Sequence, residues 1–169
     1  MKLILLRHGK SDWDVPVNDP IERPLKKRGR KDAKRIGEFF ADMPPDLIVC
    51  SPSVRTRKTA ELFAKTAGYT KEIKIDQRMY NAGHEKLLEV VHDLQGDHVV
   101  MVCHNPGIGN LAAYLDEEGG RKIAAHLHMV TAAAACLAFD GLGSWDEVKE
   151  ESGQLRALIT PRFLKDLIV

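Results

Sequence analysis

The sequence predicts an α/β fold, a three-layer α/β/α sandwich with a mostly parallel central sheet. Short runs of consecutive apolar residues, such as Leu3–Leu6, are typical of strands that are buried on both faces. Stretches with apolar residues at helical spacing separate these runs, as from Arg30 to Met43. The alternation of the two patterns indicates a sheet covered by helices on both sides. We expect one domain spanning residues 1–169.

The remaining elements follow in chain order. After the first strand, the proline-rich and acidic stretch Lys10–Pro24 is typical of a loop. The patterns then predict helices over residues 30–43, 51–67, 87–94 and 107–116, and strands over residues 46–50, 73–75, 98–103, 130–139 and 155–159. Ser51 is expected to cap the second helix, because serine is a good N-cap and Pro52 suits the first turn.

The composition argues against several function classes. Twenty-five basic and 24 acidic residues give a net charge of +1, which gives no reason to expect nucleic acid or an anionic membrane as a partner. Cys50, Cys103 and Cys136 are widely spaced, which argues against disulfides and a zinc site and suits a reducing cytosol. The apolar start is too short for a signal peptide, and no run reaches the roughly 18 apolar residues of a membrane span. We expect a cytoplasmic protein.

Chemistry-bearing side chains stand where predicted strands end. His8 follows the first apolar run directly, with Arg7 beside it, and His104 follows the strand over residues 98–103. Arg55 lies one turn into the helix after the second strand. Ligands of open α/β sheets bind at the carboxyl ends of strands, and a helix start favours an anion. The four side chains are therefore candidates for one anion site.

Each of these residues also has a plain structural interpretation. A histidine at a strand end can simply be hydrogen-bonded within the fold. Arg55 competes with Arg57 and Lys58, which could together form a solvated helix face. The argument for function comes from the four residues together, since each stands at a junction facing the same predicted edge.

Three segments resemble signatures of the histidine phosphatase (phosphoglycerate-mutase-like) superfamily. They are Arg7-His8-Gly9, similar to its R-H-G; Arg23-Pro24-Leu25 with Gly29, similar to its R-P-L-T-x-x-G; and Ser51-Pro52-Ser53-Val54-Arg55 with Thr59-Ala60, similar to its S-P-x-x-R-x-x-x-T-A. The third match selects Arg55 over Arg57. The resemblance spans the chain and implies a histidine phosphatase-like version of the α/β sandwich.

Later segments are similar to one branch of this superfamily, the SixA-type phosphohistidine phosphatases. His104-Asn105-Pro106-Gly107 resembles the H-N-P-G of that branch. Thr131-Ala132-Ala133 and Pro161-Arg162 also look like it.

The resemblance implies a role for each matched residue. His8 would attack phosphorus and become transiently phosphorylated, while Arg7, Arg55 and His104 would hold the non-bridging oxygens. Elementary chemistry agrees, because a transferring phosphoryl group spreads negative charge over those oxygens and arginine matches them with a planar fork. His8 must be neutral to attack, whereas His104 could act as a cationic donor. No metal or other cofactor is needed for this chemistry.

Other residues are weaker candidates. Ser11, Tyr80 and Asn105 are expected to line the substrate pocket. His126 and His128 could form a metal-binding pair on one strand face, but no third ligand is evident, so no metal is expected.

One departure from the superfamily bears on the substrate. Ester-cleaving members carry a glutamate general acid in a pattern like D-x-R-L-x-E, and here the run Asp76–Asn81 places Asn81 at that position. An amide cannot protonate a departing alkoxide, and general acid help is typically worth about 10²–10⁴ in rate. Imidazole has a conjugate-acid pKa near about 6.5, so it can leave phosphohistidine without a dedicated acid. Glu85 or Asp14 could still supply a proton from a loop.

Two further residues need interpretation. Asp14 stands where mutase-like members often have asparagine, and a carboxylate there would repel phosphate. We therefore expect Asp14 to point away or to pair with a basic side chain. His84 is interpreted as a helix-start residue.

The sequence thus favours a phosphatase that works through a phosphohistidine intermediate and dephosphorylates phosphohistidine on a protein, such as a phosphotransfer domain. One alternative is a metal-independent phosphatase of small phosphorylated metabolites. Another is a non-catalytic phosphate-binding module, which the intact set of Arg7, His8, Arg55 and His104 argues against.

Overall fold

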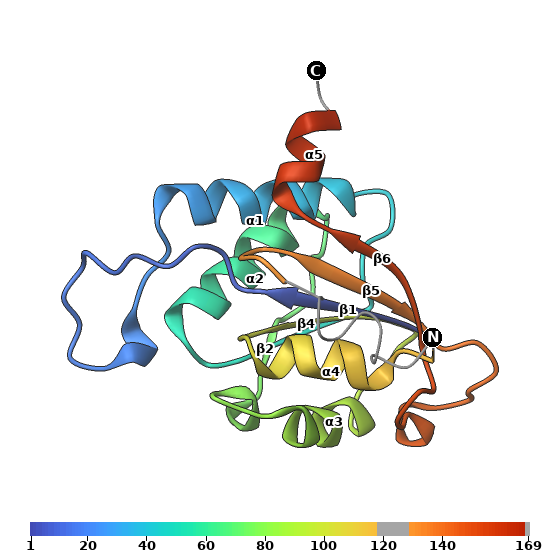
Figure 1. Ribbon diagram of the computed structural model, residues 1–169. Coiled ribbons are helices and arrows are strands. Elements are labelled where there is room, and N and C mark those ends of the chain that lie inside the picture. Colours follow the sequence, from blue (N-terminus) through green and yellow to red (C-terminus); the bar gives the residue numbers. More distant parts are fainter. Residues whose placement is uncertain (118–128, 168–169) are drawn as a thin grey trace.

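A six-stranded sheet forms the centre of the protein in the computed structural model, which describes residues 1–117 and 129–167 (Figure 1). The strands are β1 (Lys2–Arg7), β2 (Leu47–Cys50), β3 (Lys74–Ile75), β4 (His98–Cys103), β5 (Ala134–Ala138) and β6 (Gln154–Ile159). Their order is β3-β2-β4-β1-β5-β6. The first four in that order are parallel, and β5 runs antiparallel to both β1 and β6. The mostly parallel sheet is confirmed.

Helices cover both faces of the sheet (Figure 1). They are α1 (Lys27–Phe39), α2 (Val54–Thr66), α3 (His84–His92), α4 (Gly107–Leu115) and α5 (Pro161–Leu167). Strand β1 shows the reason for this arrangement. Its successive side chains point to opposite faces of the sheet, and those on both faces are apolar. Leu3 and Leu5 are buried in the cluster formed with α3 and α4, whereas Ile4 and Leu6 are buried in the cluster formed with α1 and α2. Burying each such side chain stabilises the fold by about 1.5–3 kcal/mol. The three-layer sandwich is confirmed.

Several predicted boundaries were wrong. Helix α1 was predicted over residues 30–43. It begins three residues earlier, at Lys27, and ends four residues earlier, at Phe39. Strand β5 begins only at Ala134, since a turn over residues 131–132 precedes it with Ala132 at φ 61°. Helix α5 was not predicted.

The cap of α2 is also different from the expectation. Ser53, not Ser51, is the N-cap, and its side chain accepts a hydrogen bond from the amide of Thr56. Three residues therefore lie between the end of β2 and the start of α2. This leaves the hydroxyl of Ser51 available for another contact, described below.

The parallel strands end together at one edge of the sheet. Val102 on β4 pairs with Leu6 on β1 and with Cys50 on β2. The residues that follow these three strands therefore meet. All three cysteines are free, as expected. Within the described residues, no helix has the length and apolarity needed to cross a membrane.

Candidate active site

The carboxyl edge brings His8 and His104 together. Their ring centroids are 5.3 Å apart, with the rings edge-on at 61°. The pairing of β1 with β4 continues past the end of β1, because the amide of His8 donates to the carbonyl of Cys103 at 3.1 Å. Both side chains are buried beneath the rim. The register of two parallel strands therefore fixes the distance between the two imidazoles.

His8 presents an unprotonated nitrogen toward the site. Its Nδ1 lies 2.8 Å from the carbonyl oxygen of Gly9, and a carbonyl can only accept, so Nδ1 carries the proton. Burial lowers the pKa of His8 to about 4, with the charges of Arg55 and Arg7 adding to the effect and the Gly9 carbonyl opposing it. The ring is therefore neutral near pH 7, and its Nε2 holds a free lone pair. This is the state that a nucleophilic histidine requires.

His104 is neutral as well, with the opposite tautomer. A guanidinium can only donate, so Arg55 Nη2, at 3.2 Å, donates to His104 Nδ1. His104 Nε2 then carries the proton and donates to Ser51 Oγ at 2.7 Å. Burial lowers the pKa of His104 to about 3, helped by Arg55, His8 and Arg7. The expectation of a cationic His104 was wrong for the free protein, because it is buried beside two arginines.

Arg55 reaches the site from the first turn of α2. Its Nη1 donates to the carbonyl of Pro20 at 2.8 Å, at the start of the 3₁₀ turn η1 (Pro20–Glu22). Burial lowers the pKa of Arg55, and neighbouring Tyr80 opposes that shift. The two hydrogen-bonded ends of the guanidinium hold it in one orientation beside His104.

Arg7 and Asn105 share a backbone acceptor. Arg7 Nη1 and Asn105 Nδ2 both donate to the carbonyl of Met129, at 2.7 and 3.1 Å. Among the described residues, Arg7 Nε and Asn105 Oδ1 are buried without a hydrogen-bond partner. Leaving a buried polar group unpaired costs about 1–3 kcal/mol. A bound oxyanion would give Arg7 Nε an acceptor.

Two side chains that the sequence did not single out hold the site together. Ser51 accepts from His104, as described above. Thr59 Oγ1 accepts from the amide of Gly9 at 3.0 Å and donates to the carbonyl of Arg55 at 2.7 Å. Thr59 thus links the loop after His8 to the helix that carries Arg55. Both residues lie within the S-P-x-x-R-x-x-x-T-A segment, which was the signal that could have found them.

Glycines allow α1 to approach the loop after His8. A Cβ on Gly9 would lie 2.6 Å from the carbonyl oxygen of Gly29, and a Cβ on Gly29 would overlap the carbonyl oxygen of Lys10. The two backbones are therefore in contact. This explains the place of Gly29 in the segment that begins at Arg23.

The weaker candidates have different outcomes. The ring of Tyr80 lies 5.7 Å from that of His104, edge-on, so Tyr80 is at the site. Asn105 is also there, beside Arg7. Ser11 is buried in the loop after β1, where its backbone bridges to Leu25, and no hydrogen bond of its side chain with the cluster is seen in the described residues.

The possible proton donors lie elsewhere in the described structure. Asp14 is paired with Lys26 at 2.6 Å and its side chain is 81% exposed, which confirms that it pairs with a basic group. The carboxylate of Glu85 contacts the ring of His84 at 3.4 Å and is 78% exposed. Asn81 is exposed on a turn at φ 53°. His84 is the first residue of α3, as interpreted.

A metal site is not evident in the parts of the chain that the structure covers. No three histidine, cysteine, aspartate or glutamate side chains gather there in a way that could hold a metal ion. His126 and His128, the possible metal pair, lie outside the described residues.

Known proteins are similar to this chain in sequence and in fold. The family model of the histidine phosphatase superfamily (branch 1) matches residues 3–84. A 2,3-bisphosphoglycerate-dependent phosphoglycerate mutase of Chlamydia felis (strain Fe/C-56) is 30% identical over 122 residues, 71% of this chain and 52% of the mutase. The matched regions cover only 31% and 52% of the first two curated relatives.

Solved structures match over nearly the whole chain. A SixA structure from Agrobacterium tumefaciens is 25% identical with a TM-score of 0.76, covering 95% of this chain and 97% of that one. The protein histidine phosphatase SixA in complex with tungstate is 17% identical with a TM-score of 0.76, covering 97% and 99%. The sequence signatures, the fold and the grouping of Arg7, His8, Arg55 and His104 agree with these matches: the chain belongs to the histidine phosphatase superfamily and has the fold of its SixA-type members.

Proposed function

We propose that this protein is a phosphatase that removes the phosphoryl group from phosphohistidine on a protein, by way of a phosphorylated His8. The observation that carries the proposal is the state of His8. Its Nδ1–H donates to the Gly9 carbonyl, which leaves the Nε2 lone pair free, and its ring packs edge-on against that of His104. Its pKa is lowered to about 4 by burial first and by the nearby charges of Arg55 and Arg7.

The reaction has two steps. In the first, His8 Nε2 attacks phosphorus, a new N–P bond forms, and the N–P bond of the substrate breaks with its electron pair going to the substrate imidazole. In the second, water attacks the phosphorus of phosphorylated His8, and inorganic phosphate and free His8 result. Arg7 and Arg55 offset the charge on the equatorial oxygens in both steps, and His104, whose Nε2–H is oriented by Ser51, shares that hydrogen with a non-bridging oxygen.

The leaving group of phosphohistidine needs no general acid, which fits the absence of the glutamate at position 81. The two carboxylates that could have replaced the glutamate, Asp14 and Glu85, are mostly exposed and contact Lys26 and His84 instead. A substrate imidazole whose second nitrogen is protonated departs as a neutral molecule, since its conjugate acid has a pKa near about 6.5. An alkoxide needs a proton on departure, and neither Asp14 nor Glu85 is placed to give it. The site therefore suits a P–N bond better than an alkyl ester.

The comparisons support this choice of substrate. One matched structure is of a protein histidine phosphatase, and it binds tungstate, a tetrahedral oxyanion like phosphate. Its fold covers this chain almost completely. We expect the phosphoryl donor to be a protein, such as a phosphotransfer domain.

Hydrolysis rates on three substrates test the proposal. Purified protein without added metal is given a phosphohistidine peptide, an aryl phosphate and a sugar phosphate, alongside His8→Ala. We expect kcat/KM for phosphohistidine to exceed that for the sugar phosphate by at least about 10², the rate otherwise supplied by a general acid. The His8→Ala variant should lose turnover of all three.

Other outcomes would overturn the proposal. Equal turnover of the sugar phosphate would indicate a phosphatase of small metabolites. The absence of turnover on every substrate would indicate a phosphate-binding module.

A further inference from the structure

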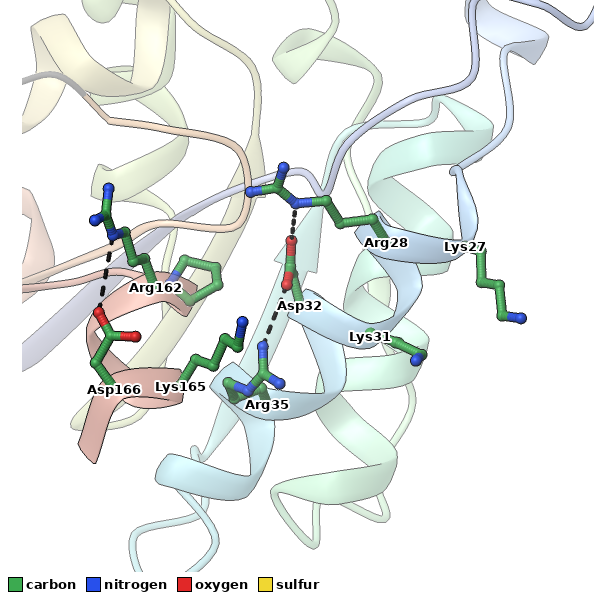
Figure 2. A pocket seen from close by; sticks show the side chains of 9 residues that line it. Lys27, Arg28, Lys31, Asp32, Arg35, Arg162, Lys165 and Asp166 are labelled. Atoms are coloured by element: carbon green, nitrogen blue, oxygen red, sulfur yellow. Dashed lines mark hydrogen bonds and ion pairs between the residues drawn. The ribbon is translucent and has the colours of Figure 1, made fainter. Parts of the chain in front are cut away.

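A strongly basic cleft lies between α1 and α5 (Figure 2). Its volume is about 880 Å³. It is lined by six basic side chains from the two helices, together with two carboxylates and a proline. The basic residues are Lys27, Arg28, Lys31, Arg35, Arg162 and Lys165, and the others are Asp32, Asp166 and Pro161. None of these residues belongs to the catalytic cluster. The cleft is therefore a separate feature of the surface.

The cleft concentrates charge that the rest of the chain lacks. Six basic residues against two acidic ones give an excess of four positive charges. The net charge of the whole chain is only +1. The protein outside the cleft therefore has more acidic than basic residues, so a partner with negative charge is drawn to this face in particular.

The carboxylates do not neutralise the cleft. Asp32 is buried and lies 3.4 Å from both Arg28 and Arg35, so it holds the two guanidiniums along α1 (Figure 2). Asp166 contacts Arg162 at 3.8 Å, on α5. In the described residues, Lys31 and Lys165 are exposed and form no ion pair. Their charges are available to a partner.

The cleft opens at the same edge of the sheet as the active site. Strand β6 leads into α5, and Ile159 at its end is paired with Ala134, which is paired with Leu6 of β1. Two strand spacings separate Ile159 from Leu6, about 10 Å. The start of α1 touches the loop after His8, since the amide of Lys26 donates to the carbonyl of Lys10 at 2.9 Å. A molecule bound in the cleft would therefore lie beside the catalytic rim.

The spread of the cations fits an extended acidic chain better than a single phosphate ion. Lys27, Lys31 and Arg35 are four residues apart on α1, so they form a row about 12 Å long on one helix face. Arg162 and Lys165 line the opposite wall. A row of that length matches about four residues of an extended segment, at roughly 3.3 Å per residue.

We propose that this cleft docks an acidic segment of the phosphorylated protein substrate and so raises the rate on that substrate. The inference rests on the proposed function, because it assumes that the phosphoryl group arrives on a protein. Contacts at a charged rim act mainly on association and are screened by salt. The cleft should therefore change KM and its salt dependence without changing the chemical step.

Two peptides and two variants test the docking site. One phosphohistidine peptide has neutral flanks, and the other has the same centre with a run of glutamates added on one side. The variant Lys31→Glu/Lys165→Glu cancels the excess of four positive charges in the cleft. The control variant Lys74→Glu/Lys149→Glu makes the same change in charge at two exposed lysines that do not line the cleft, and Lys74 lies on β3, at the edge of the sheet opposite to β6.

At low ionic strength, we expect the wild type to prefer the glutamate peptide by about tenfold in kcat/KM, through KM. The cleft variant should lose this preference and keep the wild-type rate on an aryl phosphate, which shows that its fold and active site are intact. The control variant should keep the preference. At about 1 M salt, where the Debye length is about 3 Å, the preference of the wild type should vanish.

Failure of the docking site is distinguishable from failure of the proposed function. Equal rates on both peptides, or an unchanged preference in the cleft variant, would overturn the docking site while phosphohistidine hydrolysis stands. A preference lost equally in the control variant would also overturn it, since only overall charge would then matter. If neither peptide is hydrolysed, the proposed function is wrong and the docking site falls with it.

Discussion

His8 and His104 are the same kind of residue at neighbouring strand ends, yet their hydrogen bonds make them chemically different. His8 donates a hydrogen bond from Nδ1–H to a backbone carbonyl and keeps the lone pair of Nε2 free. His104 accepts a hydrogen bond from Arg55 at Nδ1 and donates one from Nε2–H to Ser51. A buried position beside two arginines keeps both rings neutral. The difference in roles therefore comes from the groups that hydrogen-bond to each ring, and the sequence does not show these contacts directly.

The neutral state of His8 can be measured by following its ring protons by NMR. The pKa of His8 is lowered to about 4 by burial, so its signals should not titrate between pH 8 and pH 5.5. The His8→Gln variant assigns the signals. A titration centred near the ordinary value of about 6.5 would contradict this description of the site.

Ser51 and Ser53 offer a matched pair of variants two residues apart. Ser51→Ala removes the acceptor that orients His104, and a hydrogen bond contributes about 0.5–1.5 kcal/mol, so kcat/KM should fall about tenfold. Ser53→Ala removes the cap of α2 and should lower the free energy of unfolding by about 1 kcal/mol.

Aryl phosphate kinetics and denaturant unfolding separate the two effects. We expect Ser53→Ala to keep at least half of the wild-type kcat/KM. If Ser53→Ala reduced activity as much as Ser51→Ala does, the contact between Ser51 and His104 would have no special role.

At the scale of elements, the sequence predicted the strands better than the helices. Strand β4, at His98–Cys103, was predicted with its observed bounds, because a continuous apolar run ends there at a polar His-Asn-Pro. Helix α1 starts three residues early because its first turn is basic and shows no apolar period. Helix α5 was missed, since Pro161–Leu167 is only seven residues long and just two of them are buried. Packing against α1, which a local pattern does not show, is what places it.

The residues of the site were likewise predictable only where a local pattern marks them. His8, His104, Arg7 and Arg55 were predictable because each stands at a junction that the apolar pattern marks. Ser51 and Thr59 were given no role in the site, because a serine after a strand suggests a helix cap and a threonine within a helix shows no function by its spacing.

The contact between α1 and the loop after His8 can be tested at Gly29. Helix propensity alone predicts that Gly29→Ala stabilises the protein by about 0.5–1 kcal/mol. The structure predicts the reverse, because the added Cβ would overlap the backbone of Lys10. Overpacking typically costs about 1–3 kcal/mol, and the loop that carries His8 should shift.

Thermal unfolding and aryl phosphate turnover check this prediction, with Lys34→Ala as an exposed control on the same helix. Both stability and kcat should fall in Gly29→Ala and stay near wild type in the control. A stabilised Gly29→Ala would show that α1 does not press on the loop.

For the whole molecule, the two buried histidines tie stability to pH. The folded state lowers the pKa of His8 to about 4 and of His104 to about 3, by burial first, while the unfolded values lie near about 6.5. Above about pH 6.5 the lowered pKa values do not change the free energy of unfolding, because both rings are neutral in the folded and the unfolded state. As the pH falls below that value, the unfolded chain binds protons that the folded protein excludes, so the free energy of unfolding falls.

By pH 5 the loss should be about 2 kcal/mol for each of the two histidines. Denaturant unfolding at pH 7 and pH 5 measures it, and the difference should largely disappear in a variant with both His8→Gln and His104→Gln. The same loss of stability in wild type and variant would exclude these histidines as its cause.

The central claim is that the phosphoryl group of a phosphohistidine substrate passes to His8. The most direct measurement is rapid quenching in alkali, which preserves phosphohistidine, after mixing the protein with a labelled phosphohistidine peptide, followed by peptide mapping of the label. We predict label on the peptide that contains His8, formed and lost at rates consistent with turnover and absent in His8→Ala. Release of phosphate with no label on His8, or with label on another residue, would contradict the account.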